Sequence, residues 1–247
     1  MNSEQLQAFE SVLKSKSANM ALNLAKKLGN TANDKKAKLF LEAIVIKAGE
    51  PQWICSFAVD IKGANIKALQ SAIIKADDPE WIYSFAVDVK GANIKALQSA
   101  IIKAGKSYWI CSFAEDVKGA DIKALQSAII KAGEPQWIYN FAIDVKGADI
   151  KALQSAIIKV GDPEWIYNFA IDVKDADIKA LQDAIIKVDN PEWIYNFAID
   201  QALISKLSRT RKAPKKAVST QELDDIISKH SSKQLTKLAK QIFANSG

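Results

Sequence analysis

The chain has 247 residues, of which 49% are hydrophobic and 25% charged, which is ordinary for a globular protein with a sizeable core. No apolar run approaches the roughly 18 residues that suggest a membrane-spanning helix, so a membrane protein is not expected. Residues 1–10 are polar and acidic and have no apolar stretch typical of a secretory signal peptide. We therefore expect a cytoplasmic location.

The net charge of +6 is unevenly distributed along the chain. Residues 1–200 contain 24 basic and 25 acidic residues and carry a net charge of −1. Residues 201–247 contain 10 basic and 3 acidic residues and carry +7. The basic character therefore belongs to the C-terminal segment.

Residues 1–52 predict a helical N-terminal cap. The segments Ser3–Lys14 and Ala18–Leu28 have the apolar spacing of amphipathic helices. Residues 41–49 match the second helix of the repeat that follows them, including its closing glycine. Terminal repeats are usually atypical because one of their sides faces water.

A 28-residue repeat dominates residues 53–207. Its six tryptophans stand 28 residues apart, at Trp53, Trp81, Trp109, Trp137, Trp165 and Trp193. The string between them is nearly constant, as in WIYNFAIDVKGADIKALQSAIIKVGDPE at residues 137–164. Five full copies and the first half of a sixth are present, which indicates a repeat architecture.

Each copy predicts two short helices. Asp162 is placed to cap the first helix of its copy, with Pro163 at the first helical position. Gly147 is placed to end such a helix in the left-handed conformation, and Asp149 to cap the second helix. Because helices this short are marginal alone, they must bury their apolar faces on neighbouring repeats. We expect the tryptophans to form the core between repeats, with a stack of aromatic ligand sites as the alternative.

This paired-helix repeat resembles the HEAT-like class of α-solenoids over roughly residues 17–200. The resemblance implies an all-α, right-handed α-solenoid with a helical N-terminal cap and a short helical C-terminal tail. The 28-residue period is shorter than the roughly 40–47 residues of HEAT repeats or the 34 of tetratricopeptide repeats. HEAT-like arrays mostly act as binding scaffolds, and a few resemble DNA glycosylases of the alkylpurine type.

The polar positions of the repeat predict two surfaces of different charge. The first helices display one aspartate per copy, seven residues after the tryptophan, with serine or asparagine four residues before it. The second helices display two lysines per copy, eight residues apart. These lysines are Lys67, Lys75, Lys95, Lys103, Lys123, Lys131, Lys151, Lys159, Lys179 and Lys187. Such a surface either binds phosphates or an acidic protein, or is simply solvated.

The third repeat departs from the consensus. It reads Gly105-Lys106-Ser107-Tyr108 where other copies have proline, and it has Glu115 where they have valine or isoleucine. Neutral drift and a local bend or specificity point are both compatible with these changes.

The repeat ends after Asp200, and residues 201–207 are expected to complete its last helix. Residues 208–218 predict a basic linker, and residues 219–247 a helical tail with helices at about 220–229 and 232–243. The candidate phosphate-binding residues of the linker are Arg209, Arg211, Lys212, Lys215 and Lys216. A basic run of this kind binds nucleic acid through phosphates or serves as a solvated linker, and both interpretations stay open.

The sequence contains none of the common catalytic or nucleotide-binding strings. His230 is the sole histidine, and Cys55 and Cys111 occupy equivalent positions two repeats apart. Repeat spacing places these thiols too far apart for a disulfide, and we expect both to be reduced. We therefore assign no catalytic residue, metal ligand or small-molecule cofactor.

Three functions remain. The favoured one is a non-enzymatic interaction protein whose solenoid surface binds another protein. The alternative is a nucleic-acid-binding protein that uses the lysine rows and the basic tail. The third is a solenoid DNA glycosylase that uses an aspartate and a tryptophan in a groove.

Overall fold

The computed structural model describes the backbone of residues 1–210 and the side chains of residues 1–200. These residues contain 14 α-helices and no strand. The chain divides into two compact units, an N-terminal unit (Met1–Ala132) and a C-terminal unit that begins at Gly133. Each unit is an α-solenoid of serial two-helix repeats, so the predicted fold class is confirmed.

The helices of the N-terminal unit are α1 Ser3–Ser15, α2 Ala18–Lys27, α3 Ala32–Ala48, α4 Pro51–Asp60, α5 Ile66–Ala76, α6 Pro79–Asp88, α7 Ile94–Ala104, α8 Ser107–Asp116 and α9 Ile122–Ala132. Those of the C-terminal unit are α10 Pro135–Asp144, α11 Ile150–Val160, α12 Pro163–Asp172, α13 Ile178–Val188 and α14 Pro191–Thr210. Helix α14 includes the first three residues of the predicted basic linker, residues 208–210. The predicted tail helices lie outside the described residues.

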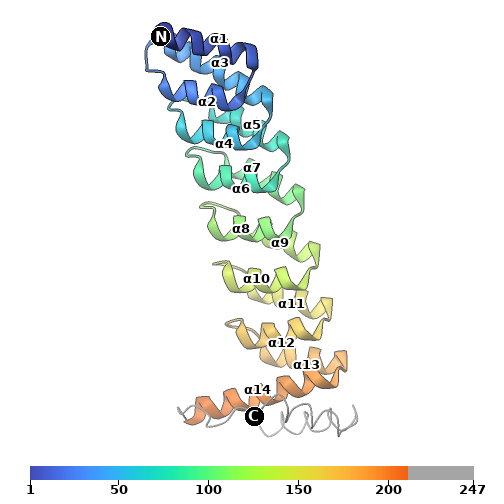
Figure 1. Cartoon of the computed structure of the whole chain (residues 1–247). Helices are drawn as coiled ribbons and strands as arrows, with labels where there is room; N and C mark the ends of the chain where they lie inside the picture. The colour runs from blue at the N-terminus through green and yellow to red at the C-terminus, as the bar shows by residue number, and fades with distance from the viewer. Residues whose placement is uncertain (211–247) are drawn as a thin grey trace. The chain divides into compact units, whose positions relative to one another are not determined.

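Within each unit the helices alternate between two layers (Figure 1). In the N-terminal unit, α2, α4, α6 and α8 pack in series in one layer, and α3, α5, α7 and α9 in the other. In the C-terminal unit, α10, α12 and α14 form the first layer and α11 and α13 the second. Helix α1 packs on α2 at the start of the N-terminal unit.

The predicted helix starts are confirmed. The Asp162 carboxylate accepts hydrogen bonds from the backbone N–H groups of Glu164 (3.0 Å) and Trp165 (3.4 Å) at the start of α12. The Asp149 carboxylate accepts from the N–H of Ala152 at 3.1 Å at the start of α11. Both satisfy N–H groups that the first helical turn leaves without a partner.

The predicted role of Gly147 needs correction. Helix α10 already ends at Asp144, and Gly147 lies in the turn to α11 with a φ of +85°. The N–H of Ala148 donates to the carbonyl of Val145 at 3.3 Å, which closes a turn with Gly147 at its third position. A positive φ at that position is the requirement of a type II turn.

The core is built on phenylalanine rather than on tryptophan, which corrects our expectation. The six phenylalanines that follow the tryptophans by four residues are completely buried. They are Phe57, Phe85, Phe113, Phe141, Phe169 and Phe197. All six tryptophans are only half-buried. In the C-terminal unit Trp165 and Trp193 lie against tyrosines of the preceding repeats, with ring centroids 5.4 and 5.3 Å apart. The tryptophans therefore join repeats at an edge of the core.

A buried glutamine joins the second helices of successive repeats. The Gln98 side-chain N–H donates to the carbonyl of Asp121 (3.2 Å), and the backbone N–H of Asp121 donates to the Gln98 amide oxygen (2.7 Å). Gln70 makes the same two bonds to Asn93, and Gln154 makes them to Asp177. The residue that each glutamine contacts is the N-cap of the second helix in the next repeat. We call this reciprocal pair of bonds the glutamine clamp.

Replacing Gln98 with leucine should destabilise the N-terminal unit by about 1–3 kcal/mol, because the peptide groups of Asp121 would lose their buried partner. Ser99→Ala, at the exposed neighbouring position, should change stability by less than about 0.5 kcal/mol. Urea denaturation followed by circular dichroism measures both. Equal stability of the two variants would show that the clamp contributes nothing.

Replacing Phe169 with alanine should cost about 3–5 kcal/mol, the range for truncating a fully buried aromatic side chain. Trp165→Ala should cost less, because its ring is half-buried and solvent can reach the vacated space. Thermal denaturation of the two variants beside the parent tests this order. A larger loss for Trp165→Ala would restore the tryptophans as the core.

Candidate interaction surface

The second helices present the predicted lysine rows to solvent. In α11, Leu153 and Ile157 are fully buried while Lys151 and Lys159 are exposed on the opposite side. The same division holds in α5, α7, α9 and α13, so all ten predicted lysines are exposed. Two lysines eight residues apart lie about 12 Å apart along a helix. The glutamine clamp fixes the register between successive second helices.

None of these ten lysines forms an ion pair with a side chain that the structure describes. An ion pair involving another lysine occurs in the first layer, where the Lys26 ammonium lies 2.8 Å from the Asp60 carboxylate. The ten ammonium groups are therefore free to meet an anionic partner. This arrangement is also what a solvated face would have, so exposure alone does not assign a function.

The predicted aspartate row has a different role, because several of its members hold repeats together. The Tyr83 hydroxyl donates to the Asp116 carboxylate at 2.6 Å, and the Tyr139 hydroxyl to Asp172 at 2.8 Å. Tyr167 donates to Asp200 in the same way. The hydrogen bond to Asp116 is the main cause that raises the pKa of Tyr83 to about 12. These aspartates are thus engaged within the array.

Charge differs strongly between the two units. The N-terminal unit has 18 basic and 13 acidic residues, a net charge of +5, whereas residues 133–200 have 6 and 12, a net charge of −6. Part of the difference lies next to the lysine rows. The second helices of the first two repeats are capped by Asn65 and Asn93, and those of the C-terminal unit by Asp149 and Asp177. The lysines of α5 and α7 therefore lie beside neutral caps, whereas those of α9, whose cap is Asp121, lie beside an aspartate as in the C-terminal unit.

The predicted phosphate-binding residues of the linker lie beyond the side chains that the structure describes. Arg209 belongs to the last turn of α14, where only the backbone is described. Arg211, Lys212, Lys215 and Lys216 lie outside the described residues.

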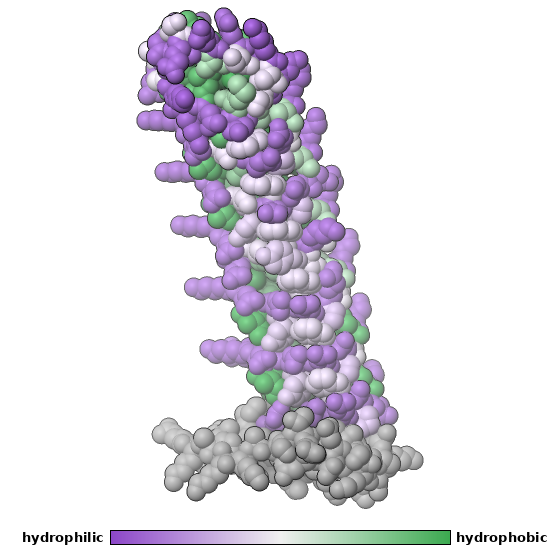
Figure 2. All heavy atoms as spheres, viewed as in Figure 1, coloured by the Kyte–Doolittle hydropathy of each residue, from purple (hydrophilic) through white to green (hydrophobic). Residues whose placement is uncertain are grey.

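Sequence reasoning missed a third lysine row. It consists of the turn lysines between the two helices of each repeat, all of which are exposed. They are Lys62, Lys90, Lys118, Lys146 and Lys174. Hydrophilic side chains project at regular intervals from one edge of the visible surface (Figure 2). The signal was present in the sequence, because each of these lysines comes two residues after the aspartate that ends a first helix.

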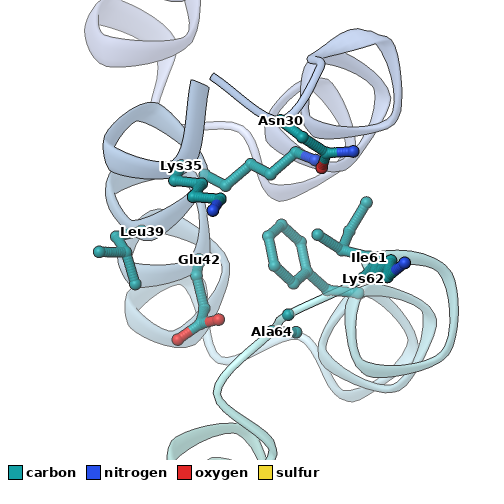
Figure 3. A pocket seen from close by; sticks show the side chains of 10 residues that line it. Asn30, Lys35, Leu39, Glu42, Ile61, Lys62 and Ala64 are labelled. Carbon is teal, nitrogen blue, oxygen red and sulfur yellow. The ribbon is translucent and has the colours of Figure 1, made fainter. Parts of the chain in front are cut away.

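Sequence reasoning also missed a pocket in the N-terminal cap, with a volume of about 480 Å³. Lys35, Leu39 and Glu42 of α3 line one side, and Ile61, Lys62 and Ala64 of the α4–α5 turn line the facing side, with Asn30 at the edge (Figure 3). Lys38 and the buried Phe57 complete the wall. We call this hollow the cap pocket.

Glu42 in the cap pocket occupies the position of the clamp glutamine. Its carboxylate accepts a hydrogen bond from the N–H of Asn65 at 2.8 Å, as the glutamine oxygens do in later repeats. Unlike glutamine, an ionised carboxylate has no N–H to donate to the Asn65 carbonyl. Burial raises the pKa of the Glu42 carboxyl, and the Asn65 hydrogen bond opposes part of that effect.

The cysteines do not form a reactive site. Both are buried thiols outside any disulfide. Burial, with a smaller contribution from the Asp88 carboxylate, raises the pKa of the Cys55 thiol to about 11. A thiol with this pKa is protonated near neutrality and is a poor nucleophile. The described residues also contain no group of three or more His, Cys, Asp or Glu placed to hold a metal ion.

Comparison with known proteins finds no matching family model, no matching curated protein and no matching solved structure. Among the described helices, none is both long and apolar enough to cross a membrane. The candidate function therefore rests on the geometry and charge of the chain itself.

Replacing Glu42 with glutamine should stabilise the cap by about 1 kcal/mol near neutral pH, because the amide completes the clamp to Asn65. A raised carboxyl pKa means that the folded state binds the Glu42 proton more tightly than the unfolded state does. The contribution of the protonated Glu42 carboxyl to the stability of the parent is therefore lost as the pH rises above the ordinary carboxyl pKa near 4.5.

The advantage of Glu42→Gln should accordingly shrink when the pH is lowered from about 7 to about 4. Hydrogen exchange of the amides in residues 61–76 measures the local stability at both pH values. Glu10→Gln, at an exposed position of α1, is the matched control and should show no such change. A glutamine variant less protected than the parent at neutral pH would contradict the interpretation.

Proposed function

We propose that this chain is a non-enzymatic interaction protein that uses its helical-repeat surface to bind another protein. The observation that carries the proposal is the set of ten exposed lysines without ion pairs, held in register within each unit by buried glutamines of the second helices. We also place the repeats with the HEAT-like solenoids, on the strength of the paired-helix unit. The scaffold role of most such arrays supports the same function.

The charge pattern favours a protein over a continuous nucleic-acid backbone. Residues 133–200 carry −6, and Asp149, Asp177 and Asp183 are exposed on or next to the second helices that bear the lysines. These acids would repel a phosphate backbone that followed the rows through the C-terminal unit. A protein surface of mixed charge can match both units.

Nucleic-acid binding is the second candidate, because the N-terminal unit carries +5 and residues 201–247 carry +7. Phosphate contacts of this kind are nonspecific in sequence and weaken steeply with salt. Glycosylase activity has less support. Asp116, Asp172 and Asp200, which lie on the first helices near the tryptophans, already accept hydrogen bonds from tyrosine hydroxyls.

The decisive experiment compares two charge-reversal variants of the full chain. The first replaces Lys95, Lys103 and Lys123 of the second helices with glutamate. The second, the turn-lysine variant, replaces Lys90, Lys106 and Lys118, which are also exposed in the same unit but lie between helices and not on the second helices. Because both change the net charge equally, nonspecific attraction affects them alike.

Affinity capture from cell extract with quantitative mass spectrometry should recover a protein partner with the parent and the turn-lysine variant. The row variant should recover at least about tenfold less. Equal loss in both variants would contradict a specific surface. A gel shift with duplex DNA or RNA at about 0.15 M salt that only the row variant loses would favour the nucleic-acid alternative.

A further inference from the structure

The cap pocket lies between α3 and the turn that joins α4 to α5, where the cap meets the first repeat. Leu39, in the wall of this pocket, and its chain neighbour Phe40 are large apolar residues that are 59% and 63% exposed. In Figure 2, hydrophobic side chains gather near the N-terminal end within a hydrophilic surround.

The cap pocket is a modified form of a groove that regular repeats also contain. Between α7 and α9 the corresponding hollow, about 360 Å³ in volume, is lined by Lys95, Gln98 and Gly119 among others. Their counterparts 56 residues earlier are Leu39, Glu42 and Gly63 of the cap pocket. The cap thus replaces a lysine with leucine at one wall and has a larger hollow.

The chemistry of the walls combines apolar surface with positive charge. Leu39 and Ala64 supply accessible apolar surface above the buried Phe57 and Ile61, and Lys35, Lys38 and Lys62 bring three positive charges to the lining. Glu42 is the one carboxylate in the wall, so its ionisation leaves an excess of two positive charges. A volume of about 480 Å³ falls within the roughly 300–1,000 Å³ of ligand pockets.

We propose that the cap pocket anchors an acidic peptide segment of the protein partner, with one large apolar side chain inserted between α3 and the α4–α5 turn. Carboxylates that flank this side chain would pair with Lys35, Lys38 and Lys62. This inference rests on the proposed function, because it names a contact by which the array holds its partner. A buried apolar anchor within a charged rim is the usual composition of a strong contact point.

Charge complementarity selects this occupant over others. A basic or neutral peptide would leave three ammonium groups without counter-charges around the inserted side chain. A phosphate group would satisfy the lysines but would leave the exposed side chain of Leu39 in the pocket wall without an apolar partner. An acidic segment with an apolar anchor meets both features of the site.

The test uses the full chain and a dye-labelled heptapeptide that has one phenylalanine flanked on each side by three glutamates. Fluorescence polarisation at about 0.15 M salt should show saturable binding. A peptide with alanine for phenylalanine, and one with lysines for glutamates, should each bind at least about tenfold more weakly. Binding of all three peptides alike would overturn the proposal.

Variants locate the binding in the pocket. Lys35→Glu with Lys38→Glu should weaken the acidic peptide at least about tenfold, whereas Lys36→Glu with Lys47→Glu, on exposed positions of the same helix outside the pocket, should leave affinity within about twofold. Ala64→Leu, which fills the hollow, should also weaken binding. Glu42→Gln should strengthen it, because that substitution removes the one negative charge of the wall.

Circular dichroism establishes that each variant is folded, and the gain expected for Glu42→Gln cannot arise from unfolding. Equal loss with both lysine pairs, or no effect of Ala64→Leu and Glu42→Gln, would overturn the site. Failure of the peptide while the row-dependent capture of a partner succeeds would reject this pocket and leave the proposed function standing. Peptide binding without any row-dependent capture would support the pocket and reject the function proposed for the lysine rows.

Discussion

The buried glutamine of the second helix is the interaction on which the regularity of each unit depends. At the start of every regular second helix, the N-cap side chain satisfies an N–H group inside its own helix. The N-cap peptide itself would remain without partners at the junction between repeats. For α7, α9 and α13 the glutamine of the preceding repeat supplies both the acceptor and the donor, and so fixes the position of one repeat on the next within its unit. A lateral shift of a repeat would break two buried hydrogen bonds at once.

That constraint explains why the two layers have different surfaces. In the first layer, side chains at the edge are engaged in contacts between repeats, with tryptophan against tyrosine and tyrosine against aspartate. In the second layer the equivalent task is performed below the surface by glutamine. The outward positions of the second helices are therefore not needed for packing, and the lysines there are unpaired among the described side chains. Charge can vary on this layer at little cost to the fold, as at Asp183, which stands where the other copies have serine.

The repeat period, the helix starts and the exposed lysines could be predicted, because each depends on a local pattern that recurs in every copy. The degree to which each apolar side chain is buried could not be predicted in this way. Trp165 and Phe169 are four residues apart on one helical face, and apolar spacing cannot tell which of them reaches the centre and which lies at the edge. The glutamine clamp was also missed, although a polar residue at an apolar position in every copy was its visible sign. Its partner is 23 residues away in the next repeat, so only the packing of helices reveals the bond. The cap pocket lies between α3 and the α4–α5 turn, and only the packing of these two segments brings its walls together.

A repeat protein supplies its own comparison, and this gives Glu42 its significance. The same position holds glutamine in all five later copies, at Gln70, Gln98, Gln126, Gln154 and Gln182. The Glu42 carboxylate still accepts the hydrogen bond from the backbone N–H of the next N-cap residue, so the local fold is the same as in the later copies. What changes is the loss of one donor and the gain of a charge whose buried form is unfavourable. This position gives up half of the clamp beside Leu39 and three lysines of the pocket lining, so stability and the proposed binding would compete there. Such competition is expected where a surface serves a partner rather than the fold alone.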